Sequence, residues 1–333
     1  MADVPRYTQC TMAGLLKKNI CLTLAALASY HQPSLAYVSS CPTCATNHQR
    51  ETAWGSKGSK ITAVEHLRAT PTTFGRAALF SVKEAERAEI MEALYGTSYD
   101  ERVEKGKAAQ GFLTTEADAT RTLVPPRELT YGEYELDFFL SLVSECLSFR
   151  VGGDGTDNVV ALAAEARSLV FGDIGSGCGR LVVAQALTWP WRACRGVEIV
   201  PSLHDMGEAS LKAADGIARG DGTSLSPEAL GLLKTMAPCS LSLGDVNDEV
   251  DISDIDILFC YSSSFPAFGD LLTEFSYTLG HKLRPGAQVI TTDRRLVSDG
   301  PWEFALLGER EGRNAETGGK SIAYMWQVIK SAL

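Results

Sequence analysis

The sequence lacks any run of five or more basic residues, the usual signature of a nucleic-acid-binding tail. The 333-residue chain has a formal net charge of −10. Residues 128–333 hold 16 basic and 29 acidic side chains, a balance of −13, whereas residues 1–127 hold 15 and 12, a balance of +3. The acidic main part is therefore a poor surface for direct nucleic-acid binding. It indicates a solvated acidic surface, or one that attracts a basic protein substrate.

The sequence also lacks a complete set of cysteine metal ligands. Cys41 and Cys44 form a single C-x-x-C pair with His48 nearby, and the second pair that would complete a zinc site is missing. We therefore predict no metal site. Five other cysteines lie in or beside apolar runs and are predicted to be small buried hydrophobic residues: Cys146, Cys178, Cys194, Cys239 and Cys260.

No membrane-spanning segment is expected at the N-terminus, because the apolar stretch after Lys17-Lys18 is only about ten residues long and a spanning helix needs about 20. Together with the small residues up to Ala36, this stretch is typical of a secretory signal. Acidic residues are scarce before Glu51, which also fits a transit peptide, and a leader without targeting function remains open. We expect a largely disordered leader and linker over residues 1–75, a helical segment over 76–127 and the main domain over 128–333.

A glycine-rich turn dominates that main domain. The apolar run of residues 169–171 leads through Asp173 into Gly175, Ser176, Gly177 and Gly179, and an apolar periodic segment follows over 181–187. A strand, a glycine turn and a helix in succession allow backbone N–H groups to face a ligand. Glycine is needed where a Cβ would block the ligand or where φ must be positive.

The spacing of these glycines argues against a dinucleotide. A dinucleotide site requires G-x-G-x-x-G, whereas here the third glycine comes one residue early and Arg180 takes its place. Asp173 would also repel a pyrophosphate. Because an acidic residue suits a ligand with an ammonium group and no phosphate, we predict that the turn binds S-adenosylmethionine.

Strands and helices alternate after this turn. Further strands are predicted over residues 193–199, 240–246, 255–261 and 288–292. Helices are predicted between the first two of these strands, up to residue 236, and over 269–283. A final pair of strands, residues 302–307 and 322–329, is separated by a polar glycine-rich stretch. An amphipathic helix is predicted over 136–147, and two helices over 81–109 with a break near Gly96. The pattern predicts a Rossmann-like α/β fold with a doubly wound, mostly parallel seven-stranded sheet, an antiparallel C-terminal hairpin and a helical N-terminal region.

Two segments together give the chain a narrower resemblance. Tyr131-Gly132-Glu133 precedes a Phe/Leu-rich helix, and Asp173-Ile174-Gly175-Ser176-Gly177-Cys178-Gly179 opens the next one. In this combination and order, the chain resembles class I S-adenosylmethionine-dependent methyltransferases, and among them the Dot-one (disruptor of telomeric silencing) family of histone lysine methyltransferases. The resemblance covers roughly residues 128–300.

The resemblance implies a set of cofactor-binding residues. Glu133 and Asp173 would hold the cofactor's ammonium group, and Glu198, 23 residues after Gly175, would accept the ribose hydroxyls. Asp245 would bind the adenine amino group and Val246 would pack on its ring. The cofactor-binding residues are then Tyr131, Glu133, Asp173, Gly175, Ser176, Gly177, Gly179, Glu198, Asp245 and Val246.

The resemblance also implies an acceptor channel for a neutral lysine. An apolar channel lined by aromatic rings lowers the pKa of an amine by disfavouring its charged form. The channel residues predicted from the sequence are Tyr131, Tyr261, Phe265 and Phe268. A protein substrate, possibly a histone in chromatin, would follow, with a nuclear location. A functional leader would instead direct the protein to an organelle or the secretory pathway.

Three departures from the family keep other interpretations open. The paired asparagine that precedes an aromatic residue in the family is replaced by Cys260-Tyr261 or Ser262-Ser263, Arg180 replaces an uncharged polar residue, and a basic nucleosome-binding tail is missing. A non-histone or small-molecule methyltransferase that shares only the cofactor half is therefore an alternative. An inactive cofactor-binding module is another.

Overall fold

The computed structural model describes residues 83–96, 100–104, 132–152, 158–222, 225–248, 250–314 and 318–333. All of these residues belong to one compact unit, residues 69–333. The predictions for the leader, the linker, the Cys41–Cys44 pair and Tyr131 lie outside the described residues.

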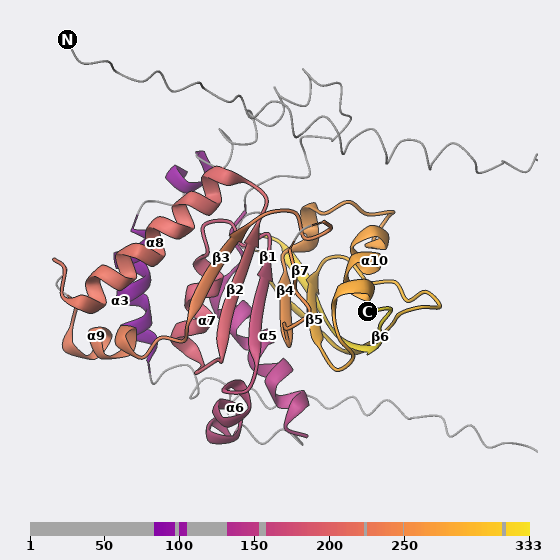
Figure 1. The fold of residues 1–333 in the computed structure, drawn as a ribbon, viewed down its shortest axis with the longest axis horizontal. Helices are drawn as coiled ribbons and strands as arrows, with labels where there is room; N and C mark the ends of the chain where they lie inside the picture. The colour runs from indigo at the N-terminus through magenta and orange to yellow at the C-terminus, as the bar shows by residue number, and fades with distance from the viewer. Residues whose placement is uncertain are drawn as a thin grey trace, which may run out of the picture. The chain divides into compact units, whose positions relative to one another are not determined.

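A seven-stranded sheet with the strand order β3-β2-β1-β4-β5-β7-β6 runs through this unit (Figure 1). Strands β1 to β5 are mutually parallel, β7 runs antiparallel to β5, and β6 pairs antiparallel with β7. The strands are β1 (Val170–Ile174), β2 (Ala193–Glu198), β3 (Cys239–Leu243), β4 (Ile257–Cys260), β5 (Gln288–Thr292), β6 (Glu303–Arg313) and β7 (Lys320–Lys330).

Helices cover both faces of the sheet. They are α3 (Glu84–Tyr95), α5 (Leu136–Arg150), α6 (Val159–Ala166), α7 (Arg180–Thr188), α8 (Pro201–Arg219), α9 (Pro227–Lys234) and α10 (Thr273–Lys282), with a 3-10 turn η3 (Ser262–Ser264). Residues 100–104 are also helical. Several helices begin at residues whose side chains accept backbone N–H groups. Glu135 caps α5, Asn158 caps α6, and Ser226 caps α9 just before a proline.

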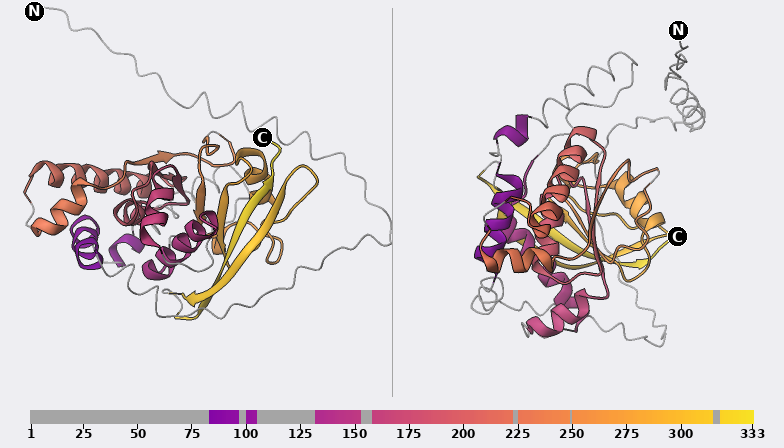
Figure 2. Two further views of the ribbon diagram at one scale, coloured as in Figure 1. Left: turned by 90° about the horizontal axis from the view of Figure 1, so that it is seen from below. Right: turned by 60° about the vertical axis from the view of Figure 1, so that its left-hand side comes forward.

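Alternate residues of the strands build two separate cores. On one face, Phe171 of β1 and Phe259 of β4 pack against α5, α6 and α7. On the other face, Val170 and Leu258 pack against α10. Figure 2 shows α10 on one side of the sheet and α3 with α5 on the other. Alternate side chains of each strand thus point to opposite faces of the sheet and pack against the two layers of helices, as expected for a doubly wound fold.

The N-terminal helix α3 is part of the same packing. Ile90, Met91 and Tyr95 are buried in a third apolar cluster with residues of α7, α8 and α9. These helices lie together at the β3 edge of the sheet (Figure 1).

The predicted fold class is confirmed, and the structure revises several boundaries. Strands β6 and β7 each extend to 11 residues, because charged residues outside their apolar stretches continue to pair across the hairpin, as Lys320 does with Glu311. The helix predicted over 269–283 begins only at Thr273, since Phe268 and Leu271 form a small antiparallel bridge before it. Helix α6 is not among the predicted elements.

Two further predictions concern the described residues. Throughout these ranges, no helix has the length and apolar character required to cross a membrane. Of the five cysteines predicted to be buried, four are buried and Cys239 is half-buried.

Candidate functional site

The glycine turn after β1 adopts the backbone conformation that its glycines permit. Gly175, Gly177 and Gly179 have φ angles of 75°, 56° and 77°, in the left-handed region that other residues enter at a cost. The N–H groups of Gly175 and Ser176 both donate to the carbonyl of Val197, at 2.9 and 3.0 Å. The turn is thereby tied to β2, and Gly179 begins helix α7.

Asp173 lies at the carboxyl end of β1, directly before this turn. It is 3% exposed, and its carboxylate has no hydrogen-bond partner among the described residues. Burial, assisted by the charge of Glu198 and opposed by that of Arg180, raises the pKa of Asp173 to about 8. A cationic ligand beside Asp173 would stabilise the charged form of its carboxyl group.

Glu198 at the end of β2 holds the turn through its side chain. Its Oε2 accepts the N–H of Gly177 at 2.6 Å, and its Oε1 accepts the N–H of Val200 at 2.8 Å. Burial raises the pKa of Glu198, although these hydrogen bonds act to lower it. Each oxygen keeps a lone pair for a further donor such as a hydroxyl.

The structure reveals a use for Glu133 that the sequence does not suggest. Arg102 donates two hydrogen bonds to its carboxylate, from Nε to Oε1 at 2.5 Å and from Nη2 to Oε2 at 2.9 Å. Arg180 approaches the same carboxylate from α7, with Nε 3.4 Å from Oε2. The side chains of Arg102, Glu133 and Arg180 are only 10%, 12% and 18% exposed.

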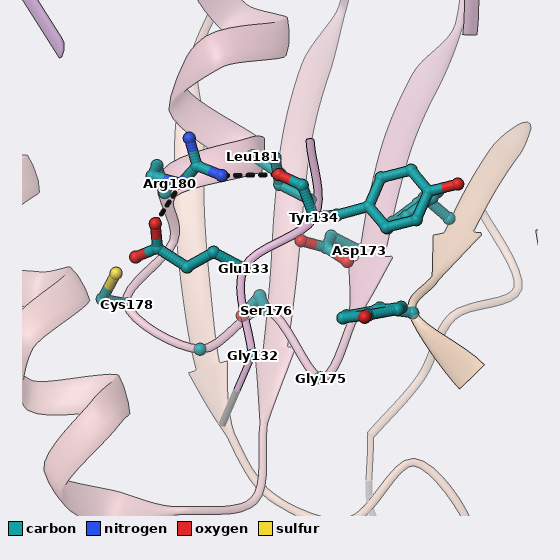
Figure 3. Close-up of a pocket in the computed structure, with 12 residues that line it drawn as sticks. Gly132, Glu133, Tyr134, Asp173, Gly175, Ser176, Cys178, Arg180 and Leu181 are labelled. Carbon is teal, nitrogen blue, oxygen red and sulfur yellow. Dashed lines mark hydrogen bonds and ion pairs between the residues drawn. The ribbon is translucent and has the colours of Figure 1, made fainter. Parts of the chain in front are cut away.

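These contacts join three parts of the chain. Arg102 also donates to the carbonyl of Tyr95 at the end of α3, at 2.8 Å. Arg180 donates through Nη2 to the carbonyl of Tyr134, at 2.7 Å. In Figure 3 the Glu133 side chain points toward Arg180. The segment 132–134 is thus held beside the glycine turn from both sides.

Aromatic rings form another wall of the site. The Tyr134 ring lies 5.3 Å from that of Phe259 and 5.1 Å from that of Tyr261, measured between centroids. Asn314 Nδ2 donates to the Tyr261 hydroxyl at 3.4 Å. Burial also raises the pKa of the Tyr134 hydroxyl, so it is neutral at any physiological pH.

Several of these groups line one pocket that is partly open to solvent (Figure 3). Its lining residues are Gly132, Glu133, Tyr134, Asp173, Gly175, Ser176, Gly177, Cys178, Arg180, Leu181, Phe259 and Tyr261. The structure therefore brings Glu133, Asp173, the turn and Tyr261, which are among the predicted site residues, to one pocket. Within the described ranges, no three side chains are grouped so as to hold a metal ion.

The other predicted site residues lie at varied distances from this pocket. Phe265 packs on Phe275 and also faces Gly175, where a Cβ would lie 3.8 Å from the Phe265 ring. Phe268 is 82% exposed and does not line the pocket. Its aromatic character indicated a channel, but the bridge that Phe268 makes to Leu271 leaves its ring in solvent.

Asp245 and Val246 follow β3, beside Glu198. The N–H of Gly244 donates to the carbonyl of Glu198 at 2.9 Å, which places this loop next to the end of β2. Asp245 accepts the N–H of Asn247 at 2.8 Å, and Val246 is buried. These residues extend the site along the carboxyl ends of the strands, where ligands of open α/β sheets bind.

Sequence reasoning misses several residues of the site. Tyr134 and Phe259 are not among the predicted site residues, and Arg102 lies outside the segment that carries the resemblance. Arg180 enters the sequence analysis only as a departure from the family. The signal available for Tyr134 is its position next to Gly132-Glu133, whereas Arg102 has no such local signal.

No protein-family model and no curated protein matches the chain. Solved structures do match in part. One is an RNA methyltransferase from Salinibacter ruber in complex with S-adenosyl-L-homocysteine, with 21% identity, 56% of this chain and 91% of that chain covered, and a TM-score of 0.31. Another is the magnesium protoporphyrin IX methyltransferase from Synechocystis PCC 6803 with bound S-adenosylmethionine. It has 13% identity and a TM-score of 0.35, and the match covers 68% of this chain and 97% of that chain. A putative RNA methyltransferase from Pyrococcus horikoshii has 12% identity and a TM-score of 0.36, and the match covers 59% of this chain and 87% of that chain. Similarities of this size carry no argument about substrate, and the strand order above is what defines the fold.

Proposed function

We propose that the protein is an S-adenosylmethionine-dependent methyltransferase. The observation that carries this proposal is Asp173, a buried carboxylate without a partner among the described residues, placed beside three left-handed glycines. A carboxylate so placed is costly unless a cation compensates it. The ammonium group of the methyl donor is such a cation.

A phosphate-containing ligand fits the same pocket poorly. Burial is the main cause that raises the pKa of Asp173, and the charge of Glu198 raises it further, so the charged form of the Asp173 carboxyl group is already disfavoured there. A pyrophosphate would add further negative charge beside Asp173 and Glu198. An NAD-type cofactor is therefore a much weaker candidate.

The residues of the pocket fit the methyl donor. The turn offers close backbone approach at Gly175 and Gly177, and the hydroxyl of Ser176 is buried without a partner among the described residues. Glu198 would accept the ribose hydroxyls and so link them to the turn, while Asp245 and Val246 would take the adenine. When bound, the cofactor supplies an electrophilic methyl group on its sulfonium.

The chain's own contribution to transfer would be to orient and desolvate the acceptor. The rings of Tyr134, Phe259 and Tyr261 would keep an incoming amine in its neutral, nucleophilic form. In line with the Tyr-Gly-Glu resemblance, we propose a lysine of a protein as the acceptor, with a histone as the first candidate.

One observation favours a second candidate, a small-molecule or non-histone acceptor. In one of the two alignments that the resemblance allows, Ser262 takes the place of the paired asparagine, and it is fully buried and exchanges hydrogen bonds with Thr292. Its Oγ donates to the Thr292 carbonyl at 2.8 Å and accepts the Thr292 N–H at 3.0 Å. Ser262 therefore ties the end of β4 to the end of β5 and is not directed at an acceptor.

Calorimetric titration with S-adenosylhomocysteine tests the donor half. We expect saturable binding by the wild type and strongly weakened binding by Asp173→Asn, while Arg192→Gln, an exposed substitution outside the pocket, binds as the wild type does. Absence of binding by the wild type would exclude the proposed activity.

Transfer of a radiolabelled methyl group tests the acceptor half. Nucleosomes, lysate proteins and a low-molecular-weight extract are incubated in parallel with the protein and labelled S-adenosylmethionine. Label on histones or other proteins supports the lysine assignment after mapping to lysine, and label only in small molecules supports the second candidate. Binding without transfer to any fraction would indicate an inactive module.

A further inference from the structure

Two cysteines of the sheet lie opposite each other on neighbouring strands. Cys194 of β2 and Cys239 of β3 are register partners in a parallel strand pair. The two strands lie side by side at one edge of the sheet (Figure 1). Both side chains pack in the same apolar cluster, so they point to the same face of the sheet. The cysteines are 45 residues apart in the sequence, and the pairing of β2 with β3 brings them together.

The spacing of the two strands suits a disulfide bond. Neighbouring strands of a sheet are about 4.7–4.9 Å apart, and the Cα atoms of disulfide-bonded cysteines are usually about 4.4–6.8 Å apart. Cys239 is the first residue of β3 and Cys194 the second residue of β2. A small backbone adjustment at these strand ends disturbs few hydrogen bonds of the sheet, so the two side chains can be bridged.

The two thiols already interact. Burial raises the pKa of the Cys194 thiol well above its ordinary value, and a hydrogen bond with Cys239 raises it further. Cys239 donates its own S–H to the carbonyl of Ala237, at 3.6 Å. Its sulfur lone pairs can therefore accept the S–H of Cys194. Cys194 thus stays protonated at neutral pH, with its sulfur beside that of Cys239.

The two thiols differ in their access to solvent. Cys239 is half-buried, whereas Cys194 is fully buried. Strand β3, which carries Cys239, is the outermost strand at its edge of the sheet. A small oxidant dissolved in water therefore reaches Cys239 first, and Cys194 lies behind it. A reactive, accessible thiol beside a second thiol that can resolve it is typical of redox-sensitive cysteines.

We propose that Cys194 and Cys239 are a redox-modification site, which hydrogen peroxide converts into a disulfide bond between β2 and β3. The Cys239 thiolate attacks one peroxide oxygen, the O–O bond breaks, and Cys239 becomes a sulfenic acid while the other oxygen leaves as water. The Cys194 sulfur then attacks the Cys239 sulfur, the S–O bond breaks, and the departing hydroxide takes the Cys194 proton as a second water. Two thiols are oxidised and one peroxide is reduced to two waters.

The disulfide acts on the stability of the sheet edge and leaves the pocket alone. Cys194 lies near the amino end of β2 and Glu198 at its carboxyl end, so about 13 Å of strand separates the bond from the pocket. The bond closes a loop that contains α8 and α9, and such a closure restricts the unfolded chain. In a reducing compartment the pair stays as thiols until peroxide rises, and in an oxidising one the bond persists. The inference is independent of the proposed methyl transfer.

Peptide mapping of the folded protein after peroxide treatment tests the inference. The full-length wild type, Cys194→Ala, Cys239→Ala and the control Cys146→Ala, at a buried cysteine of α5, are reduced and freed of reductant. Each is exposed to hydrogen peroxide, with and without dimedone to trap sulfenic acids, and the remaining thiols are alkylated. Chymotrypsin then separates Cys239 from Cys260, and thermal unfolding is recorded before and after oxidation.

We expect a peptide pair joined through Cys194 and Cys239 in the wild type and in Cys146→Ala, which dithiothreitol separates. Oxidation raises the thermal midpoints of both proteins by about 5–10 °C, and reduction restores them. Cys239→Ala shows neither the bond nor the shift, and its Cys194 stays a thiol because it is buried. Cys194→Ala accumulates dimedone-trapped sulfenic acid on Cys239, since the second thiol is missing.

Three results would overturn the inference. One is that both cysteines of the folded wild type stay as thiols. Another is conversion of Cys239 to a sulfinic acid while Cys194 stays a thiol, which would show that the two sulfurs do not meet. The third is a disulfide from Cys239 to a different cysteine, such as Cys178. Because the mapping is made on the wild type, a folding defect in either alanine variant leaves this decision intact.

Discussion

The carboxylate of Glu198 accepts the backbone N–H of Gly177 at 2.6 Å, across the gap between the end of β2 and the turn after β1. The other oxygen accepts the N–H of Val200. One acidic side chain therefore holds the glycine turn and the start of α8 in a fixed relation. The residue assigned to the ribose of the ligand is at the same time a structural support of the turn.

Replacement of Glu198 by glutamine is expected to destabilise the fold. The new NH₂ group must face one of two backbone donors, which leaves a buried N–H unpaired at a cost of about 1–3 kcal/mol. Urea unfolding monitored by circular dichroism measures the change. Glu303→Gln, at an exposed position on β6, is the control and should leave the midpoint unchanged. An unchanged midpoint for Glu198→Gln would show that the hydrogen bonds to the turn contribute nothing.

Asp173 is expected to make stability depend on pH. Its folded pKa of about 8 lies above the ordinary value of 3.8, so between these values the unfolded chain has lost a proton that the folded chain keeps. The free energy of unfolding therefore falls as pH rises through this window, by up to about 1.4 kcal/mol per pH unit for this group. The contribution of Asp173 to stability is fully present below about pH 4 and lost by about pH 8.

Asp173→Asn removes this titration. The difference in unfolding free energy between Asp173→Asn and the wild type should grow in favour of the variant from about pH 5 to about pH 8 and then level off. Chemical denaturation at several pH values provides the measurement, and subtraction cancels the other titrating groups. A difference that stays constant over this range would contradict the raised pKa.

Alanine at Gly179 is expected to destabilise the turn. Its φ of +77° is unfavourable for a residue with a Cβ, and that atom would lie 3.0 Å from Leu241 Cδ1. We expect a loss of about 1–3 kcal/mol in the free energy of unfolding. Gly231→Ala in α9 is the matched control, because its Cβ would meet no atom within 4 Å. That change should stabilise the protein by about 0.4–1 kcal/mol. Equal effects at the two positions would argue against strain at the turn.

The Arg102–Glu133 pair is expected to be strongly coupled. A double-mutant cycle with Arg102→Met and Glu133→Gln should give an interaction energy of about 1–3 kcal/mol, because both side chains are nearly buried and doubly hydrogen-bonded. The exposed Lys320–Glu311 pair, with side chains 75% and 53% exposed, is the reference cycle and should give less than about 1 kcal/mol. Similar values in both cycles would show that burial adds nothing to the Arg102–Glu133 pair.

Local sequence signals were enough to predict the glycine turn, the parallel strands and most of the helices. The turn needs positive φ at three positions, and only the absence of a Cβ at Gly175, Gly177 and Gly179 meets that need cheaply. Strands β1 and β4 are buried along their whole length, which an apolar run indicates without reference to the rest of the chain.

Local signals could not predict which charged side chains pair with one another near the pocket. Glu133 and Arg102 are 31 residues apart, and the pair exists because α3 packs on α7, α8 and α9 and carries the following segment to the pocket. The exposure of Phe268 was also beyond local signals. Its aromatic ring suited a channel, but in the structure the ring is exposed to solvent, next to a backbone bridge to Leu271.

The sequence by itself therefore determined the backbone of the proposed donor site: a strand that ends with Ile174 just after Asp173, a turn that requires glycine and a helix that begins at Arg180. Tertiary structure decided which charge each side chain meets there. The physical reason is the distance along the chain over which each effect acts. Preferences in φ and the pattern of buried residues depend only on neighbours within a few positions. The partner of a buried carboxylate depends on which distant segments the apolar cores bring together.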